Sequence, residues 1–402
     1  MMSAVPFLPL QGVRVLDLTS SLAGPTSTEI LSSLGADVVK IEHPGRGDEA
    51  RDWGPRFFEG GSVMFFSANA GKRSLALDLK DERGRKALLR LAEGADVAVQ
   101  SLRPGTAERL GIGPDDLRAR NPKLVYCTIG AFGRKGPLAA EPGYDPLMQA
   151  AAGLMSVTGE EDRPPVRVGV SLIDIGTGVW AALAILAALH EGEGRTLDLS
   201  LYETALSLLP YQLSDVLAGG ATPGRHGTAF PLIAPYEVFP TADGELMIVA
   251  GNDRLFASLC AVLDAPDLVT DVRFGSNPLR VEHRDELVEL LRARIAKHAS
   301  DDLLERLRGA GVPASPVLDV GEVAGHEQTR ATGMLQELAG GTIVAPPFSA
   351  DGERVLHRSD PPLLGEHTAE ILAEAGYDGA EIEALAAAGV VRVGQPGKPP
   401  AR

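Results

Sequence analysis

The first 130 residues alternate short apolar strands with single helices, and this alternation limits the fold more than any other feature of the sequence. Pro25 opens the first of these helices, and Gly35 supplies its left-handed end. Strands joined by single helices predict parallel pairing through βαβ crossovers, with helices on both faces of the sheet. We therefore expect a Rossmann-like α/β domain with a parallel sheet. Its strands are expected at 13–18, 37–42, 96–100 and 124–129.

The turn after the first strand lacks the glycine pattern of a dinucleotide-binding fold. Residues 21–25 have the sequence SLAGP and not G-x-G-x-x-G. Glu42 ends the second strand, where such a fold would place an acid that binds ribose. Without the glycines this match is weak, and a solvated acid at a strand end is the better interpretation. The sequence therefore argues against a nicotinamide cofactor.

A second, smaller domain is expected after a stretch rich in glycine and proline at 210–231. The runs at 236–241 and 245–250 are joined by Ala-Asp-Gly and predict a β-hairpin. With the helices and the strand that follow, this hairpin predicts an α+β domain. A final segment begins near Gly333. The further helices are expected at 254–263, 283–298, 301–310, 366–375 and 380–388, and the further strands at 314–318 and 342–345.

The charge balance excludes one large class of partners. The chain has 38 Lys and Arg against 54 Asp and Glu, which gives a formal net charge of −16. Binding to nucleic acid needs a basic face, so we expect no nucleic-acid partner. A small anionic ligand is still compatible with this charge, provided that a few basic side chains gather at one site.

The cysteines and the N-terminus favour a cytoplasmic protein. Cys127 and Cys260 lie far apart in apolar runs, which predicts buried thiols and neither a disulfide nor a metal site. Residues 1–10 lack the pattern of a signal peptide. The longest apolar run, at 179–189, is shorter than the roughly 20 residues that span a bilayer, and it predicts a buried helix. We expect no membrane partner, and disorder only in the Gly/Pro-rich tail at 393–402.

The stretch VGVSLIDIGTG at 168–178 carries the most informative acid. Asp174 stands at the mouth of an apolar helix, where backbone N–H groups and the positive helix end would keep its carboxylate ionised at neutral pH. The flanking glycines would leave room for a large ligand. An accessible, ionised carboxylate is a workable nucleophile toward a thioester. The competing interpretation is that Asp174 is only the N-cap of this helix, and the local sequence by itself favours the cap.

Other candidates are weaker when taken one by one. Tyr144, in the loop Gly143-Tyr144-Asp145, could donate a hydrogen bond into a cleft or be an ordinary half-buried ring. Lys72, Arg73, Arg103 and Arg109 each lie near a turn and could hold a phosphate or be solvated. Together they would place basic residues at one end of the sheet, where open α/β sheets bind their ligands.

Long stretches of the chain, in this order, resemble the family III coenzyme A transferases, the group of formyl-CoA transferase and the CaiB/BaiF-like proteins. The similarity begins with VLDLTSSLAGPTSTEILSSLGADVVKIEHPGRGD at 15–48. It continues through ANAGKRSLALDLK, ADVAVQSLRPGTAERLG, GYDPLMQAAAGLMSVTG and the Asp174 segment, and then through HGTAFPLIAPYEVFPTADG, AGNDRLFASLC and PPLLGEHTAEIL. It covers nearly the whole chain.

The resemblance implies an interlocked homodimer, in which each chain is threaded through a ring made by the other. It also implies that both ends of the chain build the large domain. The expected ranges are the first part of a large Rossmann-like CoA-binding domain at 1–209, a linker at 210–230, a small α+β domain at 231–320, a linker at 321–335, and a C-terminal segment at 336–402 that returns to the large domain.

The resemblance identifies Asp174 with the nucleophile of the family, which outweighs the N-cap interpretation. It implies that Asp174 attacks an acyl-CoA to form a mixed anhydride, and that the CoA thiolate then forms an aspartyl-CoA thioester and frees the first acid. An acceptor acid would reverse the two steps. The substrates are then an acyl-CoA and a carboxylic acid, and no metal or prosthetic group is required.

The resemblance also implies contacts with the substrates. Gly143, Tyr144 and Asp145 are expected near the acyl group or its oxyanion, and Gly251, Asn252 and Asp253 in an active-site loop. The residues expected to bind CoA are Ser21, Leu22, Ala23, His43, Lys72, Arg73, Gln100, Ser101, Leu102 and Arg109.

One departure from the family changes an expected contact with the adenine, and two further departures from formyl-CoA transferase argue against an oxalate and formate reaction. His43 stands where some members have an arginine, and it cannot stack a guanidinium on the adenine. Leu22 stands in place of a glutamine, and the run of glycines near 251–253 is absent. We expect succinyl-CoA as donor and a small dicarboxylate or hydroxy-diacid as acceptor. Arg46, Arg51 and Arg167 could bind a second substrate carboxylate or be surface charges.

Two alternatives share the fold. Racemases that act on 2-methylacyl-CoA use a His with an Asp, but the His position holds Tyr144, and a tyrosine with its ordinary pKa of about 10 is a poor base at neutral pH. A non-catalytic acyl-CoA-binding protein is the other alternative. The intact Asp174 with its neighbouring glycines argues against it.

Overall fold

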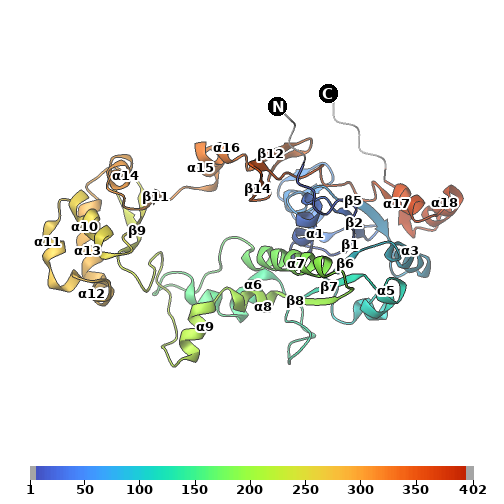
Figure 1. Ribbon diagram of the computed structural model, residues 1–402, viewed down its shortest axis with the longest axis horizontal. Helices are drawn as coiled ribbons and strands as arrows, with labels where there is room; N and C mark the ends of the chain where they lie inside the picture. The colour runs from blue at the N-terminus through green and yellow to red at the C-terminus, as the bar shows by residue number, and fades with distance from the viewer. Residues whose placement is uncertain (1–5, 395–402) are drawn as a thin grey trace. The chain divides into compact units, whose positions relative to one another are not determined.

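The computed structural model describes residues 6–394, so the first five residues and most of the 393–402 tail lie outside the described part. The chain divides into two compact units (Figure 1). Unit 1 comprises 1–154, 168–214 and 327–402, and unit 2 comprises 155–167 and 215–326. The chain therefore leaves unit 1 and returns to it.

Unit 1 is built on a seven-stranded sheet whose neighbours all pair in parallel, except for the antiparallel pair β16 and β5. The spatial order is β16-β5-β2-β1-β6-β7-β8. Along the chain, the six parallel strands thus follow the Rossmann order, which reverses direction between β1 and β6. The expected parallel sheet is confirmed. Its strands are β1 (Arg14–Leu18), β2 (Asp37–Glu42), β5 (Arg73–Leu77), β6 (Val97–Gln100), β7 (Val125–Gly130), β8 (Thr196–Ser200) and β16 (Val391–Arg392).

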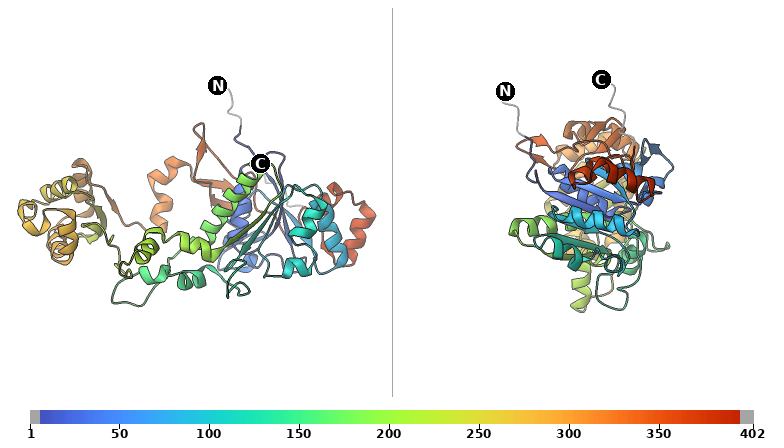
Figure 2. Two further views of the ribbon diagram at one scale, coloured as in Figure 1. Left: turned by 60° about the horizontal axis from the view of Figure 1, so that its bottom comes forward. Right: turned by 90° about the vertical axis from the view of Figure 1, so that its right-hand side faces the viewer.

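Helices cover both faces of this sheet. The left view of Figure 2 shows the green helix α7 (Leu172–Glu191) on one face and the teal and red helices on the other. The second face holds the main core, where Leu16, Val39 and Leu75 pack against apolar side chains of the covering helices. Alternate strand residues point to opposite faces, so Asp17 points away from this core. The covering helices are α3 (Glu82–Ala92), α5 (Pro114–Arg120), α17 (Thr368–Glu374) and α18 (Gly379–Ala387).

Helix α7 packs closely on α1 (Ala23–Ser33), because Gly178 has no side chain. A Cβ atom at Gly178 would lie 2.8 Å from the carbonyl oxygen of Ala23. The opposite face of α7 exposes Ile175, Val179 and Leu183, which share one helix face because they are four residues apart. The expectation of a buried helix is therefore only half right. By length and apolar composition this helix could also cross a membrane, a test that core helices of soluble proteins pass too.

Unit 2 contains an antiparallel sheet of β9 (Tyr236–Pro240), β10 (Glu245–Val249) and β11 (Ala314–Pro316). The hairpin of β9 and β10 is the one that the Ala-Asp-Gly turn predicted. Its core joins Phe239 and Leu246 of the sheet to apolar residues of the surrounding helices, three of which contribute most of them. These three helices are α10 (Asp253–Val262), α13 (Arg284–Ile295) and α14 (Ser300–Gly309).

Two segments differ from the expected ranges. Residues 155–167 group with unit 2 and not with the first domain. The physical reason is Arg225, whose guanidinium donates hydrogen bonds to the carbonyl oxygens of Glu160, Glu161 and Arg163. The expected linkers also contain helices, with α9 (Pro210–Leu217) starting at a proline, a residue well suited to a first helical turn.

The remaining elements are short. The helices are η1 (Glu49–Asp52), α2 (Val63–Phe66), α4 (Thr106–Arg109), α6 (Asp145–Ala151), η2 (Leu154–Val157), α8 (Leu201–Ser207), α11 (Pro266–Thr270), η3 (Val272–Phe274), α12 (Asn277–Glu282), α15 (Val320–Gly325) and α16 (Glu327–Thr332). The strands are β3 (Phe57–Phe58), β4 (Gly61–Ser62), β12 (Leu335–Leu338), β13 (Gly341–Val344), β14 (Ser349–Ala350) and β15 (Glu353–Arg354).

Candidate active site

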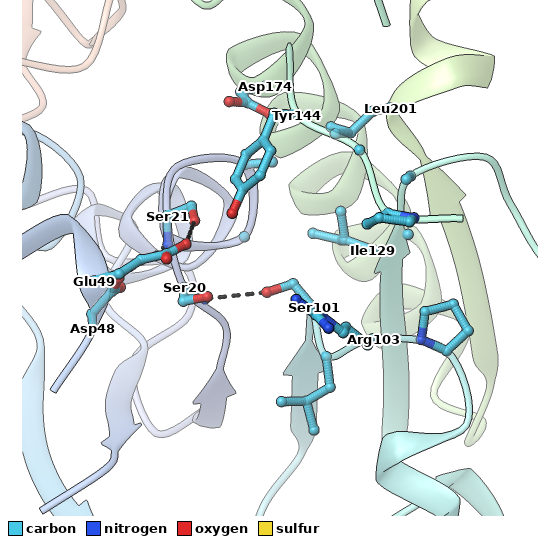
Figure 3. Close-up of a pocket in the computed structure, with 18 of the residues that line it drawn as sticks. Ser20, Ser21, Asp48, Glu49, Ser101, Arg103, Ile129, Tyr144, Asp174 and Leu201 are labelled. Atoms are coloured by element: carbon cyan, nitrogen blue, oxygen red, sulfur yellow. Dashed lines mark hydrogen bonds between the residues drawn. The ribbon is translucent and has the colours of Figure 1, made fainter. Parts of the chain in front are cut away.

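A cavity of about 550 Å³ opens in unit 1 at the carboxyl ends of the parallel strands (Figure 3). The loops after β1, β2, β6 and β7 line it, together with the starts of α6 and α7. The cavity thus lies where the strand order reverses, which is the usual ligand site of an open α/β sheet. Asp174 and Tyr144 are both among its lining residues.

Asp174 lies in the first turn of α7, three residues after Ser171, the residue that precedes the helix. Its side chain is half-buried and lines the cavity. Burial and, to a lesser extent, the nearby charge of Asp145 together raise the pKa of Asp174 to about 7. The expectation of a fully ionised carboxylate is therefore wrong. At neutral pH about half of the Asp174 carboxyl groups would carry a proton.

The start of α7 is capped by Asp145 and not by Asp174. The buried carboxylate of Asp145 accepts hydrogen bonds from the backbone N–H groups of Ile173 at 2.8 Å and Asp174 at 3.2 Å. The side chain of Gln149 donates to the other oxygen of Asp145 at 2.6 Å. The helix-end N–H groups that we expected to stabilise Asp174 are thus already occupied. Asp174 is left without a hydrogen-bond donor to its carboxylate among the described residues.

The glycines beside Asp174 serve packing more than ligand access. A Cβ at Gly176 would lie 3.3 Å from Thr204, and Gly178 faces α1. Of Gly169, Gly176 and Gly178, only Gly169 faces open space, because a Cβ atom added there would have no heavy atom within 4 Å. The expectation that these glycines clear a path for a large ligand is therefore wrong for Gly176 and Gly178.

Tyr144 precedes α6 and projects into the cavity. Its side chain is 52% exposed, and Figure 3 shows its hydroxyl pointing toward the turn that holds Ser20 and Ser21. Gly143 fixes the path of this loop, because a Cβ there would lie 2.7 Å from Met148 and 2.8 Å from Ala131. The hydroxyl of Tyr144 is thus placed to donate a hydrogen bond to a bound group.

The turn after β1 forms one wall of the cavity. Ser21 has a φ of 69°, and its N–H donates to Asp48 while its hydroxyl donates to Glu49. Ala23 lines the cavity, whereas Leu22 is buried and is not among the lining residues. Asp48 and Glu49, which line the same wall, were not among the sequence candidates.

The loop after β6 forms the facing wall. Ser101 and Leu102 line the cavity, and the hydroxyl of Ser101 accepts a hydrogen bond from the N–H of Ser20 at 3.1 Å. Gln100 is buried behind them, where its side chain contacts Thr128 and accepts from the N–H of Leu102. Gln100 therefore shapes the loop and is not a lining residue.

Basic residues gather at this end of the sheet, as expected. Some of the basic residues predicted to lie there do not line the cavity. His43, Arg46 and Arg103 line the cavity. Arg109 is exposed, donates to Thr106, and is not a lining residue.

Lys72 and Arg73 bind other protein groups and do not face the cavity. Lys72 is only 2% exposed and donates to Asp17 at 3.0 Å, to the carbonyl of Pro25 at 2.9 Å and to Asn69 at 2.8 Å. Arg73 pairs with Asp37, Glu370 and Glu374. Neither lines the cavity. The prediction that Lys72 faces a phosphate is wrong for this structure, because the ammonium of Lys72 forms an ion pair with the carboxylate of Asp17 in strand β1.

Of the three arginines considered for binding a second substrate carboxylate, only one lines the cavity. Arg51 is buried against Glu42 at 2.7 Å, so its guanidinium is occupied. Arg167 belongs to unit 2, and Arg46 is left as the one that lines the cavity. Within residues 6–394 no group of three or more His, Cys, Asp or Glu side chains is arranged to hold a metal ion.

The expected loop Gly251, Asn252 and Asp253 lies in unit 2. There the side chain of Asn252 caps α10 by accepting from the N–H of Leu255 at 3.0 Å. Asp253 pairs with the buried Arg280 at 2.7 Å. Both side chains therefore have structural partners within their own unit, and a role at the active site stays a prediction.

Comparison with known proteins gives a consistent result. The family model described as CoA-transferase family III matches residues 10–368. Succinyl-CoA:glutarate CoA-transferase of Mus musculus is 39% identical over 393 residues, covering 95% of this chain and 90% of the relative. Acetyl-CoA:oxalate CoA-transferase of Acetobacter aceti is 40% identical over 378 residues, covering 92% of this chain and 97% of the relative.

A solved structure agrees with these relatives. The crystal structure of a CAIB/BAIF family protein from Brucella suis matches with a TM-score of 0.83 and 38% identity, over 91% of this chain and 99% of that chain. The match to the family model and the identity to these relatives cover nearly the whole chain. The protein belongs to CoA-transferase family III and is a CoA-transferase.

Proposed function

We propose that this enzyme moves CoA from succinyl-CoA to a dicarboxylic acid, with Asp174 as the covalent nucleophile. The observation that carries this proposal is the state of Asp174. Its carboxylate lines the cavity, has no hydrogen-bond donor among the described residues, and has a pKa raised to about 7. A carboxylate that is poorly stabilised in its charged form is a stronger nucleophile than a solvated one.

In the first half of the proposed reaction, an oxygen of the Asp174 carboxylate attacks the carbonyl carbon of succinyl-CoA. A C–O bond forms, the C–S bond breaks, and the CoA thiolate leaves with the electron pair. The product is a mixed anhydride of Asp174 and succinate. The thiolate then attacks the aspartyl carbonyl carbon, which breaks the anhydride C–O bond, releases succinate and leaves CoA as a thioester on Asp174.

The second half repeats these steps in reverse order with the acceptor. A carboxylate oxygen of the acceptor attacks the aspartyl thioester and displaces the thiolate. The thiolate then attacks the acceptor carbonyl of the new anhydride, which forms the product acyl-CoA and frees the Asp174 carboxylate. The hydroxyl of Tyr144, which points into the cavity, is placed to donate a hydrogen bond to the negative oxygen in these steps.

The proposal of a dicarboxylic acceptor rests on the relatives and on the cavity. The names of the relatives include glutarate, oxalate, D-citramalate and mesaconate, all of which are diacids. Succinyl-CoA is the named donor for several of them. The cavity offers the side chains of Arg46, Arg103 and His43 to anionic groups. An overall acidic protein attracts such substrates only where cations of this kind are gathered.

We also propose that the active form is the interlocked homodimer. The apolar face of α7, with Ile175, Val179 and Leu183, is exposed in a single chain and would be covered by a second copy. Light scattering at low protein concentration should then report about twice the mass of one chain. A stable, active monomer would contradict the dimer without affecting the proposed chemistry.

A donor and acceptor screen tests the proposed substrates. The enzyme is incubated with succinyl-CoA and, one at a time, glutarate, D-citramalate, mesaconate and a monocarboxylate of similar length. Mass spectrometry should find a new acyl-CoA with the diacids and little with the monocarboxylate. Exchange of the α-proton of a 2-methylacyl-CoA in deuterated water, without any CoA transfer, would instead support a racemase.

A further inference from the structure

A group of buried charged side chains lies in and behind the wall of the cavity, where Asp48 is a lining residue, and the proposed reaction uses none of their charges. The ion pairs within it join Lys40 to Asp48 at 2.8 Å, Lys72 to Asp17 at 3.0 Å and Arg51 to Glu42 at 2.7 Å. All six side chains are buried. Buried ion pairs are seldom the most stable choice, because desolvation can exceed the attraction between the charges. The presence of these ion pairs therefore indicates a role other than stabilising the fold.

One of these pairs holds the backbone of the turn that faces the cavity. The ammonium of Lys40 donates to the carbonyl oxygen of Thr19 at 3.1 Å. One carboxylate oxygen of Asp48 accepts from the N–H groups of Ser21 at 3.1 Å and Ala50 at 2.9 Å. The other oxygen faces Lys40 as a contact of charges more than as a directed hydrogen bond. The pair thus holds the turn at both of its ends.

The turn needs such support because of its conformation. Ser21 has a φ of 69°, a left-handed conformation that residues other than glycine rarely adopt. The adjoining chain is crowded as well, since a Cβ at Gly24 would lie 2.3 Å from Thr19. Ser20, Ser21 and Gly24 all line the cavity, so a shift of this turn would change the shape of the wall.

We propose that the ion pair of Lys40 and Asp48 is a positioning pair for the bound CoA compound. It holds the turn at 19–21 in the conformation that the cavity requires, without touching the reacting atoms. This inference rests on the proposed function only for the identity of the ligand. It assigns to Lys40 and Asp48 an effect on binding rather than on the chemical step.

The chemistry of the carboxylate gives a discriminating substitution. Asp48→Asn keeps the shape of the side chain, but an amide has only one acceptor oxygen. That oxygen can face Lys40 or the N–H groups of Ser21 and Ala50, but not both. In the double variant Lys40→Met with Asp48→Asn the ammonium is gone, so the amide oxygen is free to face Ser21.

A control exists in the same group of buried side chains. Glu29 is buried near Lys72 and accepts from the N–H of Ala70, but it makes no hydrogen bond to the turn. Burial raises the pKa of Glu29 to about 8, so it is mostly protonated at neutral pH and Glu29→Gln is a close mimic. This variant changes a buried acid to an amide as Asp48→Asn does, without affecting the turn.

The test is calorimetric titration of the wild type and the three variants with CoA, together with thermal unfolding of each. We expect Asp48→Asn to weaken CoA binding at least about tenfold, Glu29→Gln to leave it unchanged, and the double variant to bind within about threefold of the wild type. General structural damage would make the double variant bind worse than Asp48→Asn.

The outcomes separate this inference from the proposed function. If the wild type binds CoA and Asp48→Asn binds it equally well, the positioning pair is wrong and the proposed function stands. If the double variant binds worse than the single one, the inference is wrong too, because rescue is its specific consequence. If the wild type does not bind CoA at all, both the proposed function and this inference are overturned.

Discussion

Two aspartates of unit 1, Asp17, which is fully buried, and Asp174, which is half-buried, differ in how the surrounding residues stabilise their carboxylates. Asp17, inside strand β1, accepts hydrogen bonds from Thr19 and Thr28 and pairs with Lys72. Burial alone would raise its pKa, but Lys72, Lys40 and the two hydroxyls together hold it below its ordinary value. Asp174, at the start of α7, has no such partners, and its pKa rises to about 7.

The difference supports our proposal that Asp17 is a structural acid and Asp174 the reactive one. Both side chains lose water, so burial by itself does not make a nucleophile. What differs is whether other groups stabilise the negative charge of the carboxylate. Hydrogen-bond donors and cations surround Asp17, whereas the backbone N–H groups nearest to the Asp174 side chain donate to Asp145. An uncompensated carboxylate binds protons and electrophiles more strongly. The comparison predicts that removing each acid or its partner has a distinct effect.

The largest effect is expected from Asp174→Asn. The amide keeps the shape of the side chain but is a far weaker nucleophile, so kcat should fall by several orders of magnitude. Steady-state assays of acyl-CoA transfer would measure the loss, with mass spectrometry to exclude deamidation back to Asp. An active Asn variant would place Asp174 with Asp17 among the structural acids.

The same variant has a consequence for stability. The folded pKa of Asp174 lies above its ordinary value of 3.8, so the wild type loses stability as the pH rises through the window from about 4 to 7. The Asn variant lacks this loss and should be as stable as the wild type at pH 4 and more stable at pH 8. A variant that unfolds more easily than the wild type at pH 8 would mean that the Asp174 carboxylate is compensated after all.

The next effect is expected from Lys72→Ala, which leaves Asp17 buried without its cation. Breaking one partner of a buried pair costs about 3–5 kcal/mol, so the free energy of unfolding should fall by that order. Chemical denaturation would measure it, with Arg109→Ala as a control that removes an exposed cation and should cost little. Equal stability of the two variants would mean that Lys72 faces solvent, as a ligand to phosphate would.

A smaller effect is expected from Asp145, the cap of α7. Asp145→Ala removes the acceptor for two backbone N–H groups and should cost about 1–2 kcal/mol of stability, whereas Asp174→Ala should not cost a cap. Asp145→Asn keeps an acceptor but removes the charge, so the pKa of Asp174 should fall and the acidic limb of the pH–rate profile should move to lower pH. An unmoved limb would show that the charge of Asp145 has no influence on Asp174.

A further pH-dependent effect is expected at Glu29. Its folded pKa of about 8 lies above the ordinary value of 4.5, so the wild type loses stability as the pH rises between these values. Glu29→Gln should therefore gain stability relative to the wild type over this window and show no gain at pH 4. Thermal unfolding at pH 5, 7 and 9 would measure the trend, and parallel curves for the two proteins would argue against it.

Much of the fold could be predicted because it depends on local patterns. The strand expected at 37–42 matches β2, and the helix expected between Pro25 and Gly35 matches α1, since apolar periodicity, proline and glycine act over a few residues. The edge strand β8 was not expected, because alternate residues of Thr196–Ser200 are exposed and give a weak apolar signal.

The site was predicted less completely, because its details depend on contacts between distant residues. Asp174 was named as a candidate and lines the cavity, but the cap of its helix comes from Asp145, 29 residues away, so its charge state was predicted wrongly. Lys72 was taken for a phosphate ligand because its partner, Asp17, lies 55 residues earlier in another strand. An acid within the apolar strand at 13–18 was a signal for such a partner, since a buried carboxylate needs a cation or several donors.

The most direct test of the central claim is to trap the covalent intermediate. The enzyme is incubated with succinyl-CoA and no acceptor, treated with hydroxylamine or borohydride, digested and mapped by mass spectrometry. We predict a modification on Asp174, in the peptide that contains 168–178, and none at Asp17 or in the Asp174→Asn variant. Transfer of CoA with no modification of Asp174, or with the modification on another carboxylate, would contradict the account.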